Sequence, residues 1–207
     1  MSMVAIGCEP APKPSIVPYD PYGGSDYRQI QFKDEVTSNA STTESLADLS
    51  FIDINGNVVA LKDYRDKKNV VLVVTRGYAS SVCIYCSTQT SRLLMGYSQF
   101  ESRGAEVVVV FPVSKAGDSE QQKNFVTAVK NKLDAPPEKI PFPIVLDVEL
   151  KAVDHLGIRK DLSKPATYIL DKSGRTRFAY VGEALADRPS VKALLEQLDA
   201  LNKETQE

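Results

Sequence analysis

The sequence is poor in the residues on which several kinds of functional site depend. Its 207 residues include no tryptophan, one histidine and three cysteines. The lone histidine, His155, excludes a histidine-rich metal site and disfavours a Ser-His-Asp catalytic triad. Three cysteines are too few for the disulfide framework that staples small secreted domains. Any chemistry of the chain must therefore depend on a small number of side chains.

Charge and hydropathy exclude further classes of protein. Lysine and arginine number 25 and aspartate and glutamate 27, which leaves a formal net charge of −2. Nucleic-acid binding normally requires a clustered basic face, and the basic run at residues 65–68 is expected to be a solvated turn, so no nucleic-acid partner is expected. No run of about 18 apolar residues predicts a transmembrane helix. The hydrophobic content of 43% is typical of a globular domain with a substantial core.

The amino-terminal region has the composition of a tether. Residues 5–8 read Ala-Ile-Gly-Cys, which resembles the lipobox at which bacterial lipoprotein precursors are cleaved and lipidated on cysteine. The stretch before Cys8 is shorter than an export signal and lacks its basic start. A proline-rich and then a serine- and threonine-rich segment follow, and both have linker composition. Residues 1–45 are therefore predicted to be a tether, either lipid-anchored through Cys8 in the bacterial cell envelope or without a lipid in the cytoplasm.

Regular hydrophobic patterns begin near Leu46, so residues 46–207 are predicted to form one domain. Asn55-Gly56 is a strong tight-turn pair between alternating apolar residues, which predicts a β-hairpin over residues 49–64. Runs of β-branched residues predict strands buried on both faces, whereas apolar residues three or four apart predict amphipathic helices. Further strands are predicted at residues 69–75, 105–114, 142–147, 166–171 and 176–182, and helices from Cys83 to Gly104, from Ser119 through Leu133, and at 148–158 and 189–201.

The order of these elements predicts the fold class. Strands that alternate with helices imply right-handed crossovers and parallel neighbours, whereas a hairpin adds antiparallel pairing. The sequence therefore predicts an α/β fold with a mixed central sheet, helices on both faces and an added N-terminal β-hairpin.

Two cysteines, Cys83 and Cys86, lie three positions apart where the strand at 69–75 gives way to a helix. Cys83 is then at a helix N-terminus, where free backbone N–H groups and the helix dipole stabilise a thiolate. Cys86 follows one turn later on the same side, at a separation that a disulfide can bridge. These positions favour Cys83 as the nucleophile and Cys86 as the resolving thiol.

Other interpretations of the pair stay open on these observations. A structural zinc site needs four ligands, and Cys8 and His155 are both remote in the sequence. Inert buried cysteines are common, and the spacing is equally compatible with a structural disulfide.

Four segments of the chain resemble the redoxin branch of the thioredoxin-like proteins, the alkyl hydroperoxide reductase / thiol-specific antioxidant family. They are LKDYRDKKNVVLVVTRGYASSVCIYC, VVVVFPVSKAGDSEQQKNF, FPIVLDVELKAVDHLGI and KPATYILDKSGRTRFAYVG. The resemblance implies a thioredoxin-like fold and a thiol–disulfide oxidoreductase with a redox-active Cys83–Cys86 pair. The alternative that it implies is a peroxiredoxin-like antioxidant enzyme in which Cys83 reduces hydroperoxides. It also implies that Pro165, beside Lys164, is the family's cis-proline, packed against the disulfide.

The chain departs from the peroxiredoxin signature P-x-x-x-T-x-x-C at two positions. Ser80 takes the place of the threonine, and Arg76 stands where the proline is expected. The family's later arginine, which would precede the segment ATYILD, is Pro165 here. Ser80 and Arg76 are therefore candidates for orienting a peroxide near Cys83, and a solvated loop residue is the alternative interpretation of Arg76.

The resemblance also implies the partners. The substrate would be a protein disulfide or a hydroperoxide, and a thiol–disulfide exchange protein would donate electrons. No cofactor and no metal is expected for that chemistry. Copper-delivering proteins of the same fold use two cysteines, spaced one residue further apart, and a distant histidine. A copper-carrying or non-catalytic binding module with His155 therefore stays an alternative.

Overall fold

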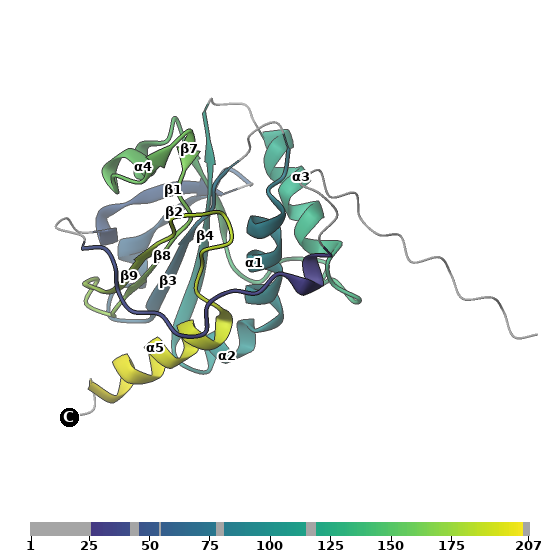
Figure 1. Ribbon diagram of the computed structural model, residues 1–207. Coiled ribbons are helices and arrows are strands. Elements are labelled where there is room, and N and C mark those ends of the chain that lie inside the picture. Colours follow the sequence, from purple (N-terminus) through teal and green to yellow (C-terminus); the bar gives the residue numbers. More distant parts are fainter. Residues whose placement is uncertain (1–25, 42–45, 54, 78–80, 115–118, 205–207) are drawn as a thin grey trace, which may run out of the picture.

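The computed structural model describes residues 26–41, 46–53, 55–77, 81–114 and 119–204. Helices pack on both faces of a mixed β-sheet (Figure 1), which confirms the predicted α/β fold. The strands are β1 (Ser50–Asp53), β2 (Val58–Ala60), β3 (Asn69–Val74), β4 (Ala105–Val113), β5 (Ile144–Val148), β6 (Arg159–Lys160), β7 (Leu162–Ser163), β8 (Ala166–Leu170) and β9 (Thr176–Val181). The helices are α1 (Ile84–Met95), α2 (Tyr97–Glu101), α3 (Ser119–Lys130), α4 (Lys151–His155) and α5 (Val191–Glu204).

The seven-stranded sheet has the order β2-β1-β5-β4-β3-β8-β9. The central strands β5, β4 and β3 are parallel neighbours, because helices connect them, and the flanking pairs are antiparallel. The β1–β2 hairpin at one edge and the β8–β9 hairpin at the other were both predicted. The shorter β6–β7 hairpin was not, because two-residue strands carry no alternating pattern.

Both faces of the sheet are covered, which explains the uninterrupted apolar run in β3. Val71 and Val73 belong to the core beneath α1, α3 and α5. Val70, Leu72 and Val74 face the opposite core, which α4 and two short 3-10 turns cover. All six residues of β3 are buried, and each of its buried valine and leucine side chains contributes roughly 1.5–3 kcal/mol to stability.

The long helix predicted after the cysteines is divided in two. It ends at Met95 and resumes at Tyr97, because Gly96 adopts φ −91° and ψ 3°, outside the helical range. Glycine is a weak helix former, and a Cβ at Gly96 would lie 3.0 Å from Val191 of α5. The absence of a side chain at Gly96 therefore lets the end of α1 approach the start of α5.

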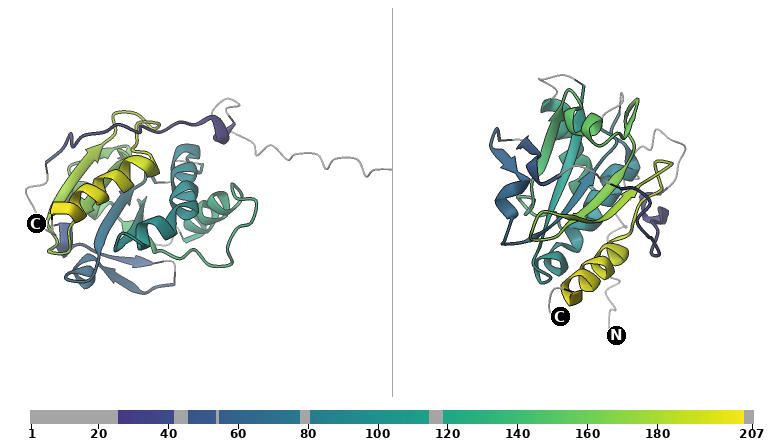
Figure 2. Two further views of the ribbon diagram at one scale, coloured as in Figure 1. Left: turned by 90° about the horizontal axis from the view of Figure 1, so that it is seen from below. Right: turned by 90° about the vertical axis from the view of Figure 1, so that its left-hand side faces the viewer.

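Residues 26–41 pack on the domain rather than forming a free tether. Figure 2 shows this segment, in purple, crossing the surface of the domain, and its last residues are hydrogen-bonded to the edge strand β9. The Ser38 hydroxyl accepts a hydrogen bond from the Ala179 N–H at 3.2 Å. The Asn39 amide accepts from the Val181 N–H and donates to the Val181 carbonyl, at 2.8 and 3.0 Å. Polar side chains that carry no periodic pattern thus pair with an edge strand, and the packed chain begins before the predicted boundary at residue 46.

Cys8 and the lipobox-like residues lie outside the described part of the chain. None of the described helices is long and apolar enough to cross a membrane.

Candidate active site

The loop that leads from β3 to the cysteines is anchored on β4. The backbone N–H and the hydroxyl of Thr75 both donate to the Val110 carbonyl at 3.0 Å. Gly77 has φ +87°, and a Cβ there would lie 2.4 Å from the Pro112 carbonyl oxygen. Only glycine tolerates both conditions. The start of the loop is therefore fixed against the neighbouring strand.

The two cysteines lie at the start of α1, as the sequence predicted. Cys83 is the N-cap of the helix and Cys86 lies in its first turn. Both are reduced and buried, with 3% and 1% of their surface exposed. Their thiols interact through a side-chain hydrogen bond, so the pair is close enough to act as one unit.

A third residue, Arg188, completes the surroundings of Cys86. It lies in the loop between β9 and α5 and is 1% exposed. Its Nη2 donates to the Cys86 Sγ at 3.2 Å, its Nη1 to the Gln89 Oε1 at 2.6 Å and its Nε to the Leu185 carbonyl at 2.7 Å. Gln89 lies one turn after Cys86 on α1, so helix and loop together hold the guanidinium.

The burial of Arg188 requires a negative partner. Transfer of an unpaired cation into a protein interior is strongly unfavourable. Within the described ranges no carboxylate pairs with this guanidinium, and its polar contacts are a carbonyl, an amide and the Cys86 sulfur. This contact therefore favours the thiolate form of Cys86, which would carry the missing negative charge.

The pKa values of the two thiols move in opposite directions. Burial opposes ionisation of Cys86, but the hydrogen bond from Cys83, the charge of Arg188 and the Arg76 backbone N–H lower the pKa of Cys86 to about 6. The hydrogen bond to Cys86 and then burial raise the pKa of Cys83 above its ordinary value. These opposite shifts favour a single negative charge on the pair, carried by Cys86.

This assignment differs from the helix-dipole argument, which favoured Cys83 as the thiolate. A helix N-terminus acts as roughly half a positive charge, whereas Arg188 carries a full charge in direct contact with Cys86. The Arg76 N–H adds a donor 3.4 Å from the same sulfur. The local donors therefore outweigh the dipole.

The two other candidates, Arg76 and Ser80, came from the comparison with the peroxiredoxin signature, and the structure describes only Arg76. The Arg76 backbone faces Cys86, but its guanidinium pairs with Asp161, in the turn between β6 and β7, at 3.6 Å. Arg76 is thus neither a free solvated residue nor a direct side-chain partner of the sulfur. Ser80 lies outside the described residues.

Pro165 immediately precedes β8, but its peptide bond is trans, so the expectation of a cis-proline was wrong. Hydrogen bonds hold the backbone on both sides of this bond: the Lys164 N–H donates to the Ile158 carbonyl and the Gly182 N–H to the Pro165 carbonyl, both at 2.8 Å. Trans is the lower-energy isomer of an X–Pro bond. The Lys164 ammonium pairs with Glu183 at 3.8 Å.

Arg188 was not predicted, because it occurs in a polar loop that has no periodic pattern. One feature of the sequence could have indicated it: Pro165 stands where the family has an arginine, so another arginine could take that place. Ala166 at the start of β8 pairs with Val181 at the end of β9. An arginine in the loop after β9 can therefore reach the region that an arginine before β8 would occupy.

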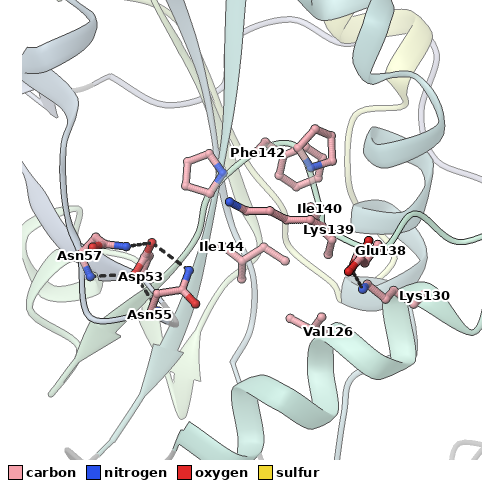
Figure 3. Close-up of a pocket in the computed structure, with 12 residues that line it drawn as sticks. Asp53, Asn55, Asn57, Val126, Lys130, Glu138, Lys139, Ile140, Phe142 and Ile144 are labelled. Carbon is pink, nitrogen blue, oxygen red and sulfur yellow. Dashed lines mark hydrogen bonds between the residues drawn. The ribbon is translucent and has the colours of Figure 1, made fainter.

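A hollow of about 620 Å³ lies elsewhere, between the β1–β2 turn and the segment joining α3 to β5 (Figure 3). Its lining residues do not include the cysteines. Several of its polar groups are paired locally: Asp53 accepts hydrogen bonds from Asn55 and Asn57, and Lys130 donates to the Glu138 carbonyl. We therefore place the candidate active site at the cysteine pair.

His155 does not lie with the cysteines. It ends α4, which packs on the face of the sheet opposite α1. In the described part of the chain no three histidine, cysteine or acidic residues are grouped to hold a metal ion.

The fold and the paired thiols define a class: thioredoxin-fold redoxins, which act as thiol peroxidases or thiol oxidoreductases. Residues 42–179 match the model of the AhpC/TSA family. The chain belongs to the AhpC/TSA family. A search of curated proteins found no match.

Solved structures agree on the fold. A cysteine-to-serine variant of peroxiredoxin 6 from Arenicola marina aligns with a TM-score of 0.66 and 16% identity, over 82% of this chain and 76% of that one. The mitochondrial 2-Cys peroxiredoxin of Plasmodium falciparum gives 0.61 and 17%, over 80% and 96%. Peroxidoxin BcpB of Mycobacterium tuberculosis gives 0.59 and 17%, over 80% and 99%.

Proposed function

We propose that the protein reduces small hydroperoxides, with Cys86 as the nucleophile and Cys83 as the resolving thiol. The observation that carries this proposal is the buried contact of 3.2 Å between the Arg188 guanidinium and the Cys86 sulfur. The thiolate is the reactive form of cysteine, and this contact favours it on Cys86. The roles are thus the reverse of those that the helix N-terminus alone suggested.

The reaction proceeds in three balanced steps. The Cys86 thiolate attacks the outer oxygen of the hydroperoxide, an S–O bond forms, the O–O bond breaks, and the leaving alkoxide takes a proton to become an alcohol. The Cys83 thiol then attacks the sulfur of the Cys86 sulfenic acid, and one water molecule leaves as the disulfide forms. An external dithiol reduces the disulfide and is itself oxidised.

Burial favours a small oxidant over a protein disulfide. Thiol–disulfide exchange requires the attacking sulfur to approach a sulfur of the substrate through a mixed-disulfide intermediate. Cys83 and Cys86 are at most 3% exposed, which disfavours a bulky partner at either sulfur. A hydroperoxide carries its reactive oxygens at the end of a small molecule.

Stopped-flow oxidation and mass spectrometry test the proposal in full-length protein carrying Cys8→Ser. The Cys83→Ser variant should react once with hydrogen peroxide and retain one added oxygen on Cys86. The Cys86→Ser variant should react no faster than a free small-molecule thiol. A fast reaction that survives Cys86→Ser but not Cys83→Ser would overturn the assignment, and slow oxidation of the unsubstituted pair would exclude a dedicated peroxidase.

A thiol–disulfide oxidoreductase is the second candidate, favoured by the C-x-x-C spacing at a helix N-terminus. Here too the pair cycles between dithiol and disulfide, but the oxidant is a disulfide. Reduction of a small disulfide such as oxidised glutathione and of a disulfide-bonded protein, compared with reduction of hydrogen peroxide under the same conditions, separates the two candidates. Faster turnover with either disulfide would favour the second one.

A further inference from the structure

Arg188 lies in a loop that has no helix or strand of its own. Residues 182–190 connect β9 to α5, yet the loop must hold a buried guanidinium against a sulfur. Its internal contacts are few: the Asp187 N–H donates to the Ala184 carbonyl and the Glu183 N–H to the Asp187 carboxylate, both at 3.0 Å, and the Arg188 Nε donates to the Leu185 carbonyl. The loop therefore depends on contacts with other parts of the chain.

One residue, Lys33, contacts the loop on both sides of Arg188. Its backbone N–H donates to the Arg188 carbonyl at 2.9 Å, and its carbonyl accepts from the Ser190 N–H at 2.8 Å. Its ammonium lies 2.7 Å from the Asp187 carboxylate and donates to the Tyr180 hydroxyl at 2.9 Å. The Tyr180 hydroxyl in turn donates to Asp187 at 2.6 Å.

The segment that carries Lys33 also binds the helix that carries Cys86. The Arg92 guanidinium of α1 donates to the Ile30 carbonyl and lies 4.9 Å from the centre of the Phe32 ring. Ile30 is buried. Residues 30–33 thus bridge α1 and the Arg188 loop, the two elements whose relative position sets the Arg188–Cys86 distance.

We propose that Lys33 is a positioning residue for the thiolate site, holding the Arg188 loop against α1 through its paired contacts with residues 187, 188 and 190. This inference deepens the proposed function, because it assigns control of the reactive thiolate to a residue about 50 positions before Cys83 in the sequence. Lys33 touches neither sulfur, so it acts through Arg188.

The groups that lower the pKa of Cys86 come from several elements, and only one of them is linked to Lys33. Cys83 is at the start of α1, the Arg76 N–H is in the loop after β3, and Arg188 is in the loop after β9. The Arg76 guanidinium is directed to Asp161. Loss of Lys33 should therefore weaken the Arg188 contribution and leave the other two in place.

The exposure of the Lys33–Asp187 ion pair limits how far loss of the Lys33 side chain can shift the Cys86 titration midpoint. The Lys33 side chain is 54% exposed and that of Asp187 16%, so solvent and salt screen their attraction. The two backbone contacts persist after a side-chain substitution. We expect Lys33→Met to raise the midpoint of thiolate formation by about half a pH unit, which corresponds to roughly threefold less thiolate below the midpoint.

The experiment follows the ultraviolet absorbance of the thiolate against pH in full-length protein carrying Cys8→Ser and Cys83→Ser, so that only Cys86 titrates among the cysteines. Lys33→Met and Asp187→Asn should both raise the midpoint relative to this background, and Lys33→Arg should restore it. High salt should move the background protein in the same direction as Lys33→Met.

Lys192→Met is the matched control. Lys192 is an exposed lysine of α5 that approaches Asp34 and Glu196 at 3.9 and 4.0 Å. Its removal deletes a nearby positive charge without a contact to residues 187 or 188, and it should leave the midpoint unchanged. Thermal unfolding of each variant verifies that the fold persists.

An unchanged midpoint in both Lys33→Met and Asp187→Asn, in folded protein, would overturn the inference. An equal shift in Lys192→Met would assign the effect to long-range charge and would overturn it too. Failure of the proposed function is a separate result: the midpoint would still respond to Lys33 while the unsubstituted pair fails to reduce hydrogen peroxide.

Discussion

Asp187 and Arg188 are adjacent in the sequence, but their charged side chains point in opposite directions. The Asp187 carboxylate pairs with Lys33 at 2.7 Å near the surface, and the Arg188 guanidinium meets the Cys86 sulfur at 3.2 Å in the interior. One peptide unit thus connects a partly exposed ion pair to a buried contact between a guanidinium and a sulfur. The arrangement fixes which charge faces the thiols.

Replacement of Arg188 by methionine should slow the reaction of Cys86 with hydrogen peroxide by roughly 10- to 100-fold near neutral pH. The reason is the loss of a hydrogen bond to a charged group, which contributes about 1.5–3 kcal/mol. Stopped-flow kinetics under single-turnover conditions measure the change. Arg188→Lys keeps the charge without the fork of donors to Gln89 and Leu185, and should be intermediate. A rate for Arg188→Met equal to that of the unsubstituted protein would contradict the assignment.

The reaction rate should depend on pH through the Cys86 thiolate. With the pKa of Cys86 lowered to about 6, the rate should rise as pH increases through about 6 and then become constant. Arg188→Met should move the rise to higher pH. A rise centred near the ordinary cysteine value of about 8.5 in the unsubstituted protein would show that the Arg188 contact does not stabilise the thiolate in solution.

The stability of the fold should depend on pH in a related way. Between about pH 6 and 8.5 the unfolded chain keeps the Cys86 proton that the native state has lost, so the free energy of unfolding should rise with pH. Above about 8.5 the native state keeps the Cys83 proton that the unfolded chain loses, so the same free energy should fall. Urea denaturation of reduced protein across this range measures both limbs. The Cys83→Ser, Cys86→Ser double variant is the control, and it should lack this pattern.

Gly77→Ala should destabilise the protein by about 3 kcal/mol or more, because it combines a positive φ with a contact of 2.4 Å to a backbone oxygen. Gly56→Ala is the matched control: its φ of +84° is nearly the same, but a Cβ there meets nothing within 4 Å. That substitution should cost only about 1–2 kcal/mol. Urea denaturation distinguishes them, and equal costs would show that contact with Pro112 is unimportant.

The predictable part of the fold was the part encoded by local pattern. The run at β3 and the Asn55-Gly56 turn each specify their own structure, because burial on two faces and a left-handed turn leave direct compositional signals. The break at Gly96 was missed, because the apolar residues on either side keep their helical spacing across it. The packing of Ser38 and Asn39 on β9 was missed because hydrogen bonds between distant segments leave no periodic pattern.

The candidate site also has a part that the sequence predicted and a part that it did not. Cys83 and Cys86 were identified because their spacing and position carry the information. Their relative acidity was not, because it depends on Arg188, which is about 100 residues away and approaches from a different element. A cis bond at Pro165 was expected from the resemblance alone, and the bond is trans, in a backbone held by hydrogen bonds at Lys164 and at the Pro165 carbonyl.

Ser38 and Asn39 cover the edge strand β9, and this has a consequence for shortened versions of the chain. A version beginning at residue 46, where the regular hydrophobic patterns start, would lack Ser38 and Asn39. The N–H groups of Ala179 and Val181 in the edge strand β9 would then have no protein partner. Bare ladder edges recruit strands from other molecules. Such a version should aggregate when it is concentrated, whereas a version beginning at residue 26 should stay monodisperse. Recombinant protein should therefore include residues 26–45.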